Sequence, residues 1–301
     1  MAACVRNPAP ASLWRAFYFC TLLLGLGILG AMAAPKPASP PATPFLQLGR
    51  PDQAEGAKAL AQLRRQGIAG SYYLEFQLRL MPRRGAERIV PGVMWGAQNS
   101  LGPITRVQLA AGTPAARRLL IQSGPEAAVW QLLPGATPPE LLDARSLFQP
   151  IVAEADLTPF DLQMPFVHWP DFVYEGLTRF RGRPAHVFLL RPPAGFAAKN
   201  PQLQGVRVQL DSQFNALVQV ELLGAGDRVT KTTTVVDLKK VGDQWIVKTI
   251  DVRDEMTRNK TRLSMTAAAL GLDLLGTLFE PGQLAGEVSP PSAATITRIA
   301  L

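Results

Sequence analysis

The chain has 301 residues, with 31 Lys or Arg against 23 Asp or Glu, which gives a formal net charge of +8. A basic chain of this kind can contact an anionic membrane surface or nucleic acid. Its positive charges are scattered, however, as they are on an ordinary solvated surface. The only cysteines are Cys4 and Cys20. Because both lie near the amino terminus, the rest of the chain can form no disulfide, thiolate nucleophile or cysteine-ligated metal site.

The first 33 residues have the three parts of a secretory signal peptide. Arg6 and Arg15 stand ahead of an apolar run over residues 16–34, in which residues 31–33 have the small-x-small pattern Ala-Met-Ala. We therefore predict cleavage after Ala33 and export of the protein. The alternative is a retained membrane anchor. The apolar run is short for a span, and a Pro-rich stretch follows it in place of a basic flank.

Export narrows the possible partners and modifications. Removal of the signal peptide leaves a net charge of +6, and an exported protein is not expected to bind nucleic acid. Bulky aromatic residues precede Cys20, where a bacterial lipoprotein signal needs a small residue, so lipidation at Cys20 is not expected. We predict a protein that is free in the periplasm of a double-membrane bacterium after cleavage.

A spacer and a helix follow the signal peptide. Residues 34–49 are rich in Pro, Ala and Ser, without apolar periodicity, which predicts an extended linker. A helix is predicted over residues 51–66, with Pro51 at its first position, Asp52 near its amino end and Gly67 as its stop. The folded domain is predicted to cover residues 50–286.

Strands dominate the next part of the chain. Residues 71–80 alternate strictly between apolar and polar or aromatic side chains, which predicts a half-buried antiparallel strand. Clusters of Gly, Pro and Ser then separate further short apolar runs. The additional strands expected in this half are residues 88–95, 104–110, 117–122 and 128–132. Together the five runs predict an antiparallel meander.

The middle of the chain interrupts this pattern. Thr158, Pro159 and Asp161 have the spacing of a helix start, with a hydroxyl N-cap, Pro at the first position and an acid three residues after the cap. Residues 270–279 are predicted to form a short apolar helix across the sheet, and residues 287–301 a loose tail. The strands predicted in this half are residues 172–180, 185–191, 205–211, 216–223, 228–238, 244–253 and 262–269.

These elements predict a mainly β protein, a curved antiparallel sheet of about ten strands with a few helices. A sheet of that size must curl rather than stay flat. One face of nearly every strand is apolar, so a second sheet, the helices or a ligand must cover it.

No catalytic or metal-binding constellation stands out. His168 and Asp171 could form an orienter–base pair, but no nucleophile motif accompanies them. A metal site would need His168 and His186 to converge with a carboxylate such as Glu175, and their spacing matches no known ligand signature. We expect no enzyme activity, no metal and no cofactor.

The carboxylates of the middle segment have a simpler interpretation. Glu154, Asp156 and Asp161 lie close together in sequence, and a glycosidase-type acid pair among them is conceivable. The better account is a helix cap at Asp161, with the others, including Asp171 and Glu175, on loops or on the polar face of a strand.

A series of short motifs resembles a known family. It begins with Leu-Thr-Pro-Phe-Asp-Leu at residues 157–162 and covers roughly residues 51–285. The sequence is similar in this way to the outer-membrane lipoprotein-sorting proteins, the LolA-like family, in a branch of uncharacterised bacterial members. The other motifs lie at residues 165–166, 169–171, 174–176, 183–187, 211, 216–218, 237–241, 244–248, 257–263, 278–281 and 284.

The resemblance implies an unclosed, strongly curved half-barrel. Its mouth would be closed by lid helices near residues 51–66, 158–164 and 270–279. In the better-known members, the concave face takes up the acyl chains of a lipoprotein. This implies an acylated lipoprotein or other lipid as ligand, with membrane-bound donor and acceptor proteins as further partners.

Two functions are therefore expected. One is a periplasmic carrier for acylated cargo, and the other is an interaction or sensor protein whose half-barrel is filled by its own side chains. For the carrier, we predict that large apolar side chains on the strands line the lipid site. These candidates are Phe76, Leu78, Trp95, Trp130, Val208, Val220 and Ile246.

Overall fold

The computed structural model describes residues 50–301. The signal peptide, its cleavage site and the linker lie outside the described residues. Within the described part there are three α-helices, α1 (Gln53–Leu63), α2 (Pro159–Gln163) and α3 (Ala194–Lys199). The strands are β1 (Ser71–Met81), β2 (Arg88–Asn99), β3 (Gly102–Leu109), β4 (Arg117–Gln122), β5 (Ala128–Leu132), β6 (Glu140–Leu141), β7 (Phe172–Phe180), β8 (Arg183–Leu190), β9 (Gly205–Asp211), β10 (Leu217–Leu223), β11 (Val229–Val241), β12 (Gln244–Asp254), β13 (Lys260–Leu272) and β14 (Thr297–Arg298).

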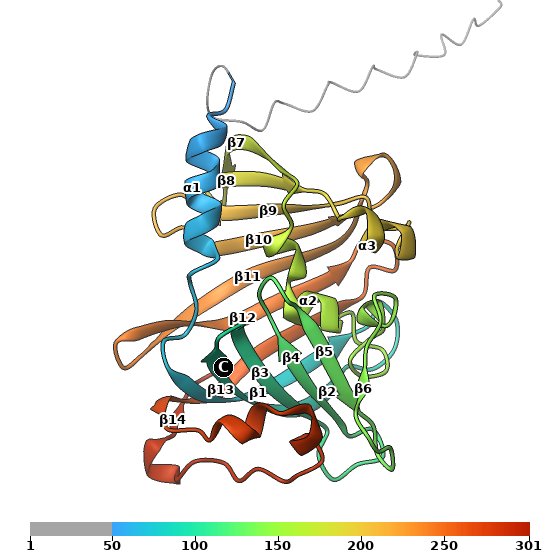
Figure 1. The fold of residues 1–301 in the computed structure, drawn as a ribbon, viewed down its shortest axis with the longest axis vertical. Coiled ribbons are helices and arrows are strands. Elements are labelled where there is room, and N and C mark those ends of the chain that lie inside the picture. Colours follow the sequence, from blue (N-terminus) through green and yellow to red (C-terminus); the bar gives the residue numbers. More distant parts are fainter. Residues whose placement is uncertain (1–49) are drawn as a thin grey trace, which may run out of the picture. The chain divides into compact units, whose positions relative to one another are not determined.

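The fourteen strands of residues 50–301 form one antiparallel sheet (Figure 1). Their order is β6-β5-β4-β3-β2-β1-β13-β12-β11-β10-β9-β8-β7, and β14 pairs with β13. Strands β6 and β7 are the two edges, so the sheet is not closed. The predicted fold class is confirmed, including the amino-terminal meander β1 to β5. The expected number of about ten strands is too low.

Strand β1 shows how the sequence pattern gives the sheet two buried faces. Leu74, Phe76, Leu78 and Leu80 alternate on one face and are all buried, while Tyr73 is buried on the other. Successive side chains of a strand point to opposite faces. We name the face of Leu78 the inner face and the face of Tyr73 the outer face.

Helix α1 begins later than predicted. Asp52 is the N-cap and accepts hydrogen bonds from the amides of Ala54 and Glu55, so Pro51 precedes the cap and is not the first helical residue. The side chain of Gln53 bonds both backbone groups of Tyr174 in edge strand β7, at 2.8 and 2.9 Å. The helix thus covers a sheet edge that would otherwise expose unpaired backbone groups.

The carboxyl-terminal part differs from its prediction. Residues 270–272 continue β13, and only Gly276–Phe279 forms a 3₁₀ turn, so the helix predicted over residues 270–279 is wrong. Short apolar runs do not distinguish a helix from a strand by periodicity. Residues 287–301, expected to be loose, contain β14, which pairs with Ala267 and Ala268 of β13.

Candidate functional site

The chain must cross the sheet between β6 and β7. These strands follow one another in sequence but form opposite edges. Their connection contains η1 (Ser146–Phe148), α2 and η2 (Pro165–His168), and α2 lies against β4 and β5 (Figure 1). Its apolar side chains pack on the inner face. We name residues 146–169 the plug.

The plug and the inner face share one apolar core. The sheet contributes buried side chains from β1–β5 and β7–β13, and α1 contributes Leu60. No second sheet covers this face in the described part of the chain. The buried residues of the plug in this core are Leu147, Ile151, Val152, Ala155, Leu157, Phe160, Phe166, Val167 and Trp169.

Aromatic rings hold the centre of the plug together. The fully buried ring of Phe160 stacks on Phe148, with 4.5 Å between the ring centroids. The rings of Phe166 and Phe196 lie 5.6 and 5.9 Å from it. Phe196 belongs to α3, in the β8–β9 connection. These rings therefore also join the plug to the part of the sheet next to edge strand β7.

Arginines outside the plug tie its backbone to the neighbouring elements. Their guanidinium groups donate to main-chain carbonyls, which leaves the apolar side chains of the plug facing the sheet. The pKa of Arg64 and that of Arg117 are lowered by burial. The bonds run from Arg64 to Val167 (2.8 Å), from Arg88 to Ala153 (2.6 Å) and from Arg117 to Pro150 (2.8 Å).

One ion pair links α2 directly to the sheet. The predicted cap is confirmed, since the side chain of Thr158 accepts from the amide of Asp161 and Asp161 accepts from the amide of Thr158 at 2.9 Å. Asp161 also accepts from Lys231 Nζ of β11 at 2.8 Å. Both side chains are largely buried. Lys231 was not among the residues predicted from the sequence, where its signal is a lone cation within a threonine-rich strand.

A second carboxylate of the plug is held without a cation. The Asp156 amide donates to Thr261 Oγ1 at 2.8 Å, and the Thr261 hydroxyl donates to the Asp156 carboxylate at 3.0 Å. Burial raises the pKa of Asp156, the bond from Thr261 opposes that shift, and the negative charge of Asp254 adds to it. Asp156 and Asp161 therefore attach the plug at two points, and no acid pair of glycosidase type is needed to explain them.

Five of the seven predicted lipid-site residues lie together in the inner core. Phe76, Leu78, Val208, Val220 and Ile246 are all at most 5% exposed. The ring of Phe76 lies over Gly92, where an added Cβ would approach within 2.3 Å of it. These five residues are thus buried members of the core that the plug also joins, and a lipid site formed by them stays a prediction.

The two remaining candidates lie on the other side of the sheet. Trp95 pairs with Tyr73 of β1, and Trp130 pairs with Leu120 of β4, which places both indoles in the outer apolar cluster. They cannot line the same site as Phe76. The prediction that all seven residues share the concave face is wrong for these two. Successive residues of a strand point to opposite faces, so a position one residue away lies on the other side of the sheet.

The carboxyl-terminal segment covers this outer cluster. Residues 273–296, which we name the strap, contribute Phe279 and Leu284 as its buried members. The fully buried Arg106 of β3 fastens the strap by donating to the carbonyls of Leu278, Gln283, Leu284 and Gly286. Burial lowers the pKa of Arg106, and the nearby charge of Arg118 lowers it further.

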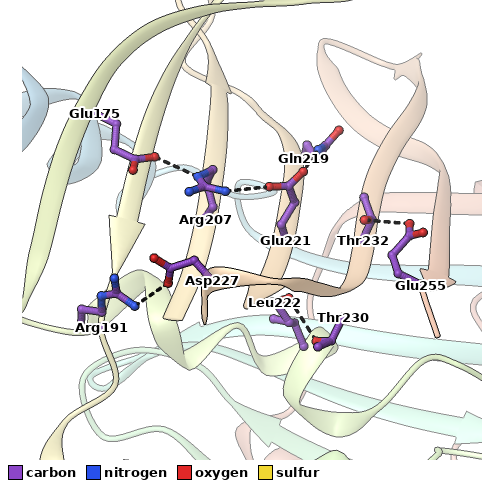
Figure 2. Close-up of polar contacts among 10 residues, drawn as sticks. All are labelled: Glu175, Arg191, Arg207, Gln219, Glu221, Leu222, Asp227, Thr230, Thr232 and Glu255. Carbon is purple, nitrogen blue, oxygen red and sulfur yellow. Dashed lines mark hydrogen bonds and ion pairs between the residues drawn. The ribbon is translucent and has the colours of Figure 1, made fainter. Parts of the chain in front are cut away.

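The other half of the outer face is polar, and no segment within residues 50–301 covers it as the strap does. Arg207 of β9 bonds Glu175 at 2.9 Å and Glu221 at 3.4 Å, and Figure 2 shows these side chains side by side. Burial alone would lower the pKa of Arg207, but its bonds to the two glutamates raise it overall. The inner face is thus largely apolar, with Lys231 and Thr261 as polar members, and the strapped half of the outer face is apolar as well.

The histidines do not converge. Tyr174 Oη lies 2.8 Å from His186 Nδ1, while Glu175 pairs with Arg207. No hydrogen bond joins His168 to Asp171 in the described part of the chain. Burial lowers the pKa of both histidines, aided at His168 by the charge of Arg64. Among residues 50–301, no group of three or more His, Cys, Asp or Glu is placed to hold a metal ion.

Two adjoining clefts open where the plug meets the sheet end. One, of about 360 Å³, has Phe148, Leu203 and Leu222 in its wall, with Lys231 and Asp156 beside them. The other, of about 610 Å³, lies at the β1–β2 and β12–β13 turns. Both are lined by Glu154, Thr257 and Asn259. We name this shared opening the mouth.

The comparisons by sequence found no match, whereas solved structures with a similar fold were found. No family model matches the sequence, and no curated protein matches it. A DUF1329 family protein from Desulfovibrio piger is similar in structure, with a TM-score of 0.66 and 16% identity over 78% of this chain and 100% of that chain.

Two further solved structures extend the similarity. A putative outer membrane lipoprotein-sorting protein domain from Vibrio parahaemolyticus has a TM-score of 0.65 and 16% identity, covering 76% of this chain and 97% of that chain. A LolA superfamily protein from Nitrosomonas europaea has a TM-score of 0.57 and 15% identity, covering 74% and 96%. The chain therefore has a LolA-like fold, and the predicted resemblance is confirmed for the fold.

One finding concerns membranes directly. No helix within residues 50–301 is long and apolar enough to cross a bilayer.

Proposed function

We propose that this protein is an exported carrier that shelters the acyl chains of a lipid-modified cargo against the inner face of its sheet, in lipoprotein sorting at the outer membrane. The observation that supports it is the apolar inner face, which extends over β1–β5 and β7–β13. Its cover is the plug, whose helices α2, η1 and η2 are at most five residues long.

An acyl chain can take the place of the plug because both are apolar. Each methylene group removed from water contributes about 0.8 kcal/mol, so cargo contacts can offset the lost contacts of Phe160 and its neighbours. The mouth offers the path, since its wall includes Phe148 and Leu222 beside the plug. We assign the acyl site to the inner cluster of Phe76, Leu78, Val208, Val220 and Ile246.

The carrier assignment includes location and partners. We propose that the exported form begins at Ala34 and is free in the periplasm, and that membrane-bound donor and acceptor proteins exchange cargo with it. Binding of this kind needs no cofactor and no bond chemistry. Amino-terminal sequencing of the exported form checks the first point, and a mature chain that begins at an acylated cysteine would refute it.

The test of the carrier is lipid binding by the purified exported protein. Solvent extraction followed by mass spectrometry should detect co-purified acyl chains, and the protein should bind a fluorescent fatty acid. Val220→Glu should weaken that binding while circular dichroism shows a retained sheet. The matched control is Val173→Glu at a side chain that is 48% exposed, which should leave binding unchanged.

A second function is favoured by the tight burial of the inner cluster. Because its five candidate residues are at most 5% exposed, the same fold would serve as an interaction module with a permanently filled interior. In that case the wild type binds no lipid, and Val220→Glu unfolds the protein, because an unpaired buried carboxylate costs several kcal/mol. These two results together would exclude the carrier.

A further inference from the structure

Three hairpin turns lie at the same end of the sheet. Because β7 to β12 follow one another as antiparallel neighbours, the β7–β8, β9–β10 and β11–β12 turns share one end, opposite to the mouth. In Figure 1 the β11–β12 hairpin reaches out beyond the lower end of α1. We name residues 179–183, 212–216 and 237–248 the rim.

Each turn of the rim has an aromatic ring beside a cation of the same or the neighbouring turn. The guanidinium carbon of Arg181 lies 5.3 Å from the ring centroid of Phe180, and that of Arg183 lies 5.3 Å from the ring centroid of Phe214. In the β11–β12 hairpin, Trp245 pairs across the strands with Lys240. Phe214 is 60% and Trp245 is 66% exposed, which is unusual for side chains of this size.

The backbone of these turns is fixed, so the rings are held out in water rather than left there by flexibility. Asp211 accepts hydrogen bonds from the amides of Gln213 and Phe214, both at 3.0 Å. The side chain of Gln244 exchanges two hydrogen bonds with the backbone of Ala69, at 2.7 and 3.2 Å. Rigid display of an exposed aromatic ring lowers the ordering cost of binding through it.

The charge of the rim is positive. The rim contains two acids, Asp237 and Asp243, and Asp237 is neutralised by Lys248. Asp211, next to the rim, is neutralised by Arg183, so Asp243 remains. Against this one acid stand four exposed cations that form no ion pair within residues 50–301, namely Arg179, Arg181, Lys239 and Lys240.

We propose that the rim docks on the headgroup region of an anionic lipid bilayer. Aromatic rings displayed by separate turns fit a planar boundary in which rings prefer the interface and cations meet anionic headgroups. Leu238, 43% exposed on the face of the hairpin that also carries Trp245, adds apolar area. Docking in this way leaves the mouth facing away from the bilayer, and it does not depend on acyl binding by the inner face.

The experiment is vesicle co-sedimentation of the exported protein. The wild type should bind vesicles of phosphatidylethanolamine with phosphatidylglycerol and not vesicles of phosphatidylcholine alone. A variant with Trp245→Ser, Phe214→Ser, Lys239→Gln and Lys240→Gln should bind at least about tenfold more weakly. Brominated acyl chains should quench wild-type fluorescence but not the residual fluorescence of Trp245→Phe, which locates that indole at the bilayer.

A matched variant at the opposite end of the sheet is the control. Ile89 and Met256 are 59% and 56% exposed, and Arg83 and Arg84 lie in the β1–β2 turn. Changing the first two to Ser and the arginines to Gln should leave vesicle binding unchanged, with both variants folded by circular dichroism. Equal loss in the two variants, or no preference of the wild type for anionic vesicles, would overturn the proposal.

Discussion

The two faces of the sheet are covered by segments of different kinds. The plug on the inner face is fixed at both ends, to β6 and β7, and contacts the sheet mainly through apolar side chains such as Phe160. The strap on the outer face is held by a buried guanidinium, that of Arg106, which bonds four main-chain carbonyls.

This difference decides which cover a ligand can replace. An apolar ligand can substitute for the contacts of the plug, because dispersion and burial are not directional. It cannot satisfy the guanidinium of Arg106, since a buried charge that loses its hydrogen-bond partners is strongly unfavourable. Under the carrier proposal the inner face is the one that exchanges its cover, and this exchange must also break the ion pair of Lys231 with Asp161.

The largest effect is expected from truncating the centre of the plug. Phe160→Ala should lower the free energy of unfolding by about 3–5 kcal/mol, because it leaves a cavity in the inner core. It should also increase binding of a fluorescent fatty acid by loosening the cover. Phe214→Ala, at a ring that is 60% exposed, is the control and should change stability by less than about 0.5 kcal/mol. A stable Phe160→Ala protein would show that the plug is not packed as described.

The strap should respond differently to loss of its anchor. Arg106→Met should cost about 3 kcal/mol, because several carbonyls lose a charged donor. Hydrogen exchange should accelerate in the strap, residues 273–296, while the plug stays protected. Arg79→Met, which removes a surface pair with Glu87, should cost no more than about 1 kcal/mol. Equal acceleration in plug and strap would mean that the two covers are coupled.

The ion pair between Lys231 and Asp161 beneath the plug should contribute less to stability than Phe160 or Arg106. Lys231→Met should cost about 2 kcal/mol in urea unfolding, because Asp161 then keeps only its bonds to Thr158. Lys240→Met, at an exposed cation, is the comparison and should have almost no effect. If both variants were equally stable, the plug would be held by its apolar contacts alone.

The smallest effect is a dependence on pH. The pKa of Asp156 is raised by burial, so the folded state favours its neutral form. That contribution to stability is fully present below the ordinary pKa of an aspartate and is lost as the pH rises through the raised value. Asp156→Asn should therefore raise the melting temperature at neutral pH, with the gain vanishing in acid. If the gain in melting temperature persisted in acid, the ionisation of Asp156 would not be its cause.

Local signals account for the elements that were predicted correctly. Strands β4, β5, β7 and β9 have the predicted bounds, because apolar runs between Gly and Pro turns need no distant partner to be recognised. The cap of α2 is equally local, since Thr158 and Asp161 bond each other.

The incorrect predictions concern features that depend on a contact with a residue far away in the sequence. Trp95 and Trp130 read as apolar strand residues, but their face depends on pairing parity, which places them with Tyr73 rather than Phe76. Residues 270–272 extend β13 because β1 lies beside them, with Ser71 opposite Leu272. Lys231 has no local sign of its partner, which is 70 residues away.

The sequence by itself determined the class of this protein: an open antiparallel sheet with an apolar face, short helices and a series of turns similar to the LolA-like family. Alternation and turn chemistry act between near neighbours, so they can be read along the chain. Only the tertiary structure decided how that face is covered. The strand order places β6 and β7 at opposite edges, and this forces their connection across the inner face as the plug.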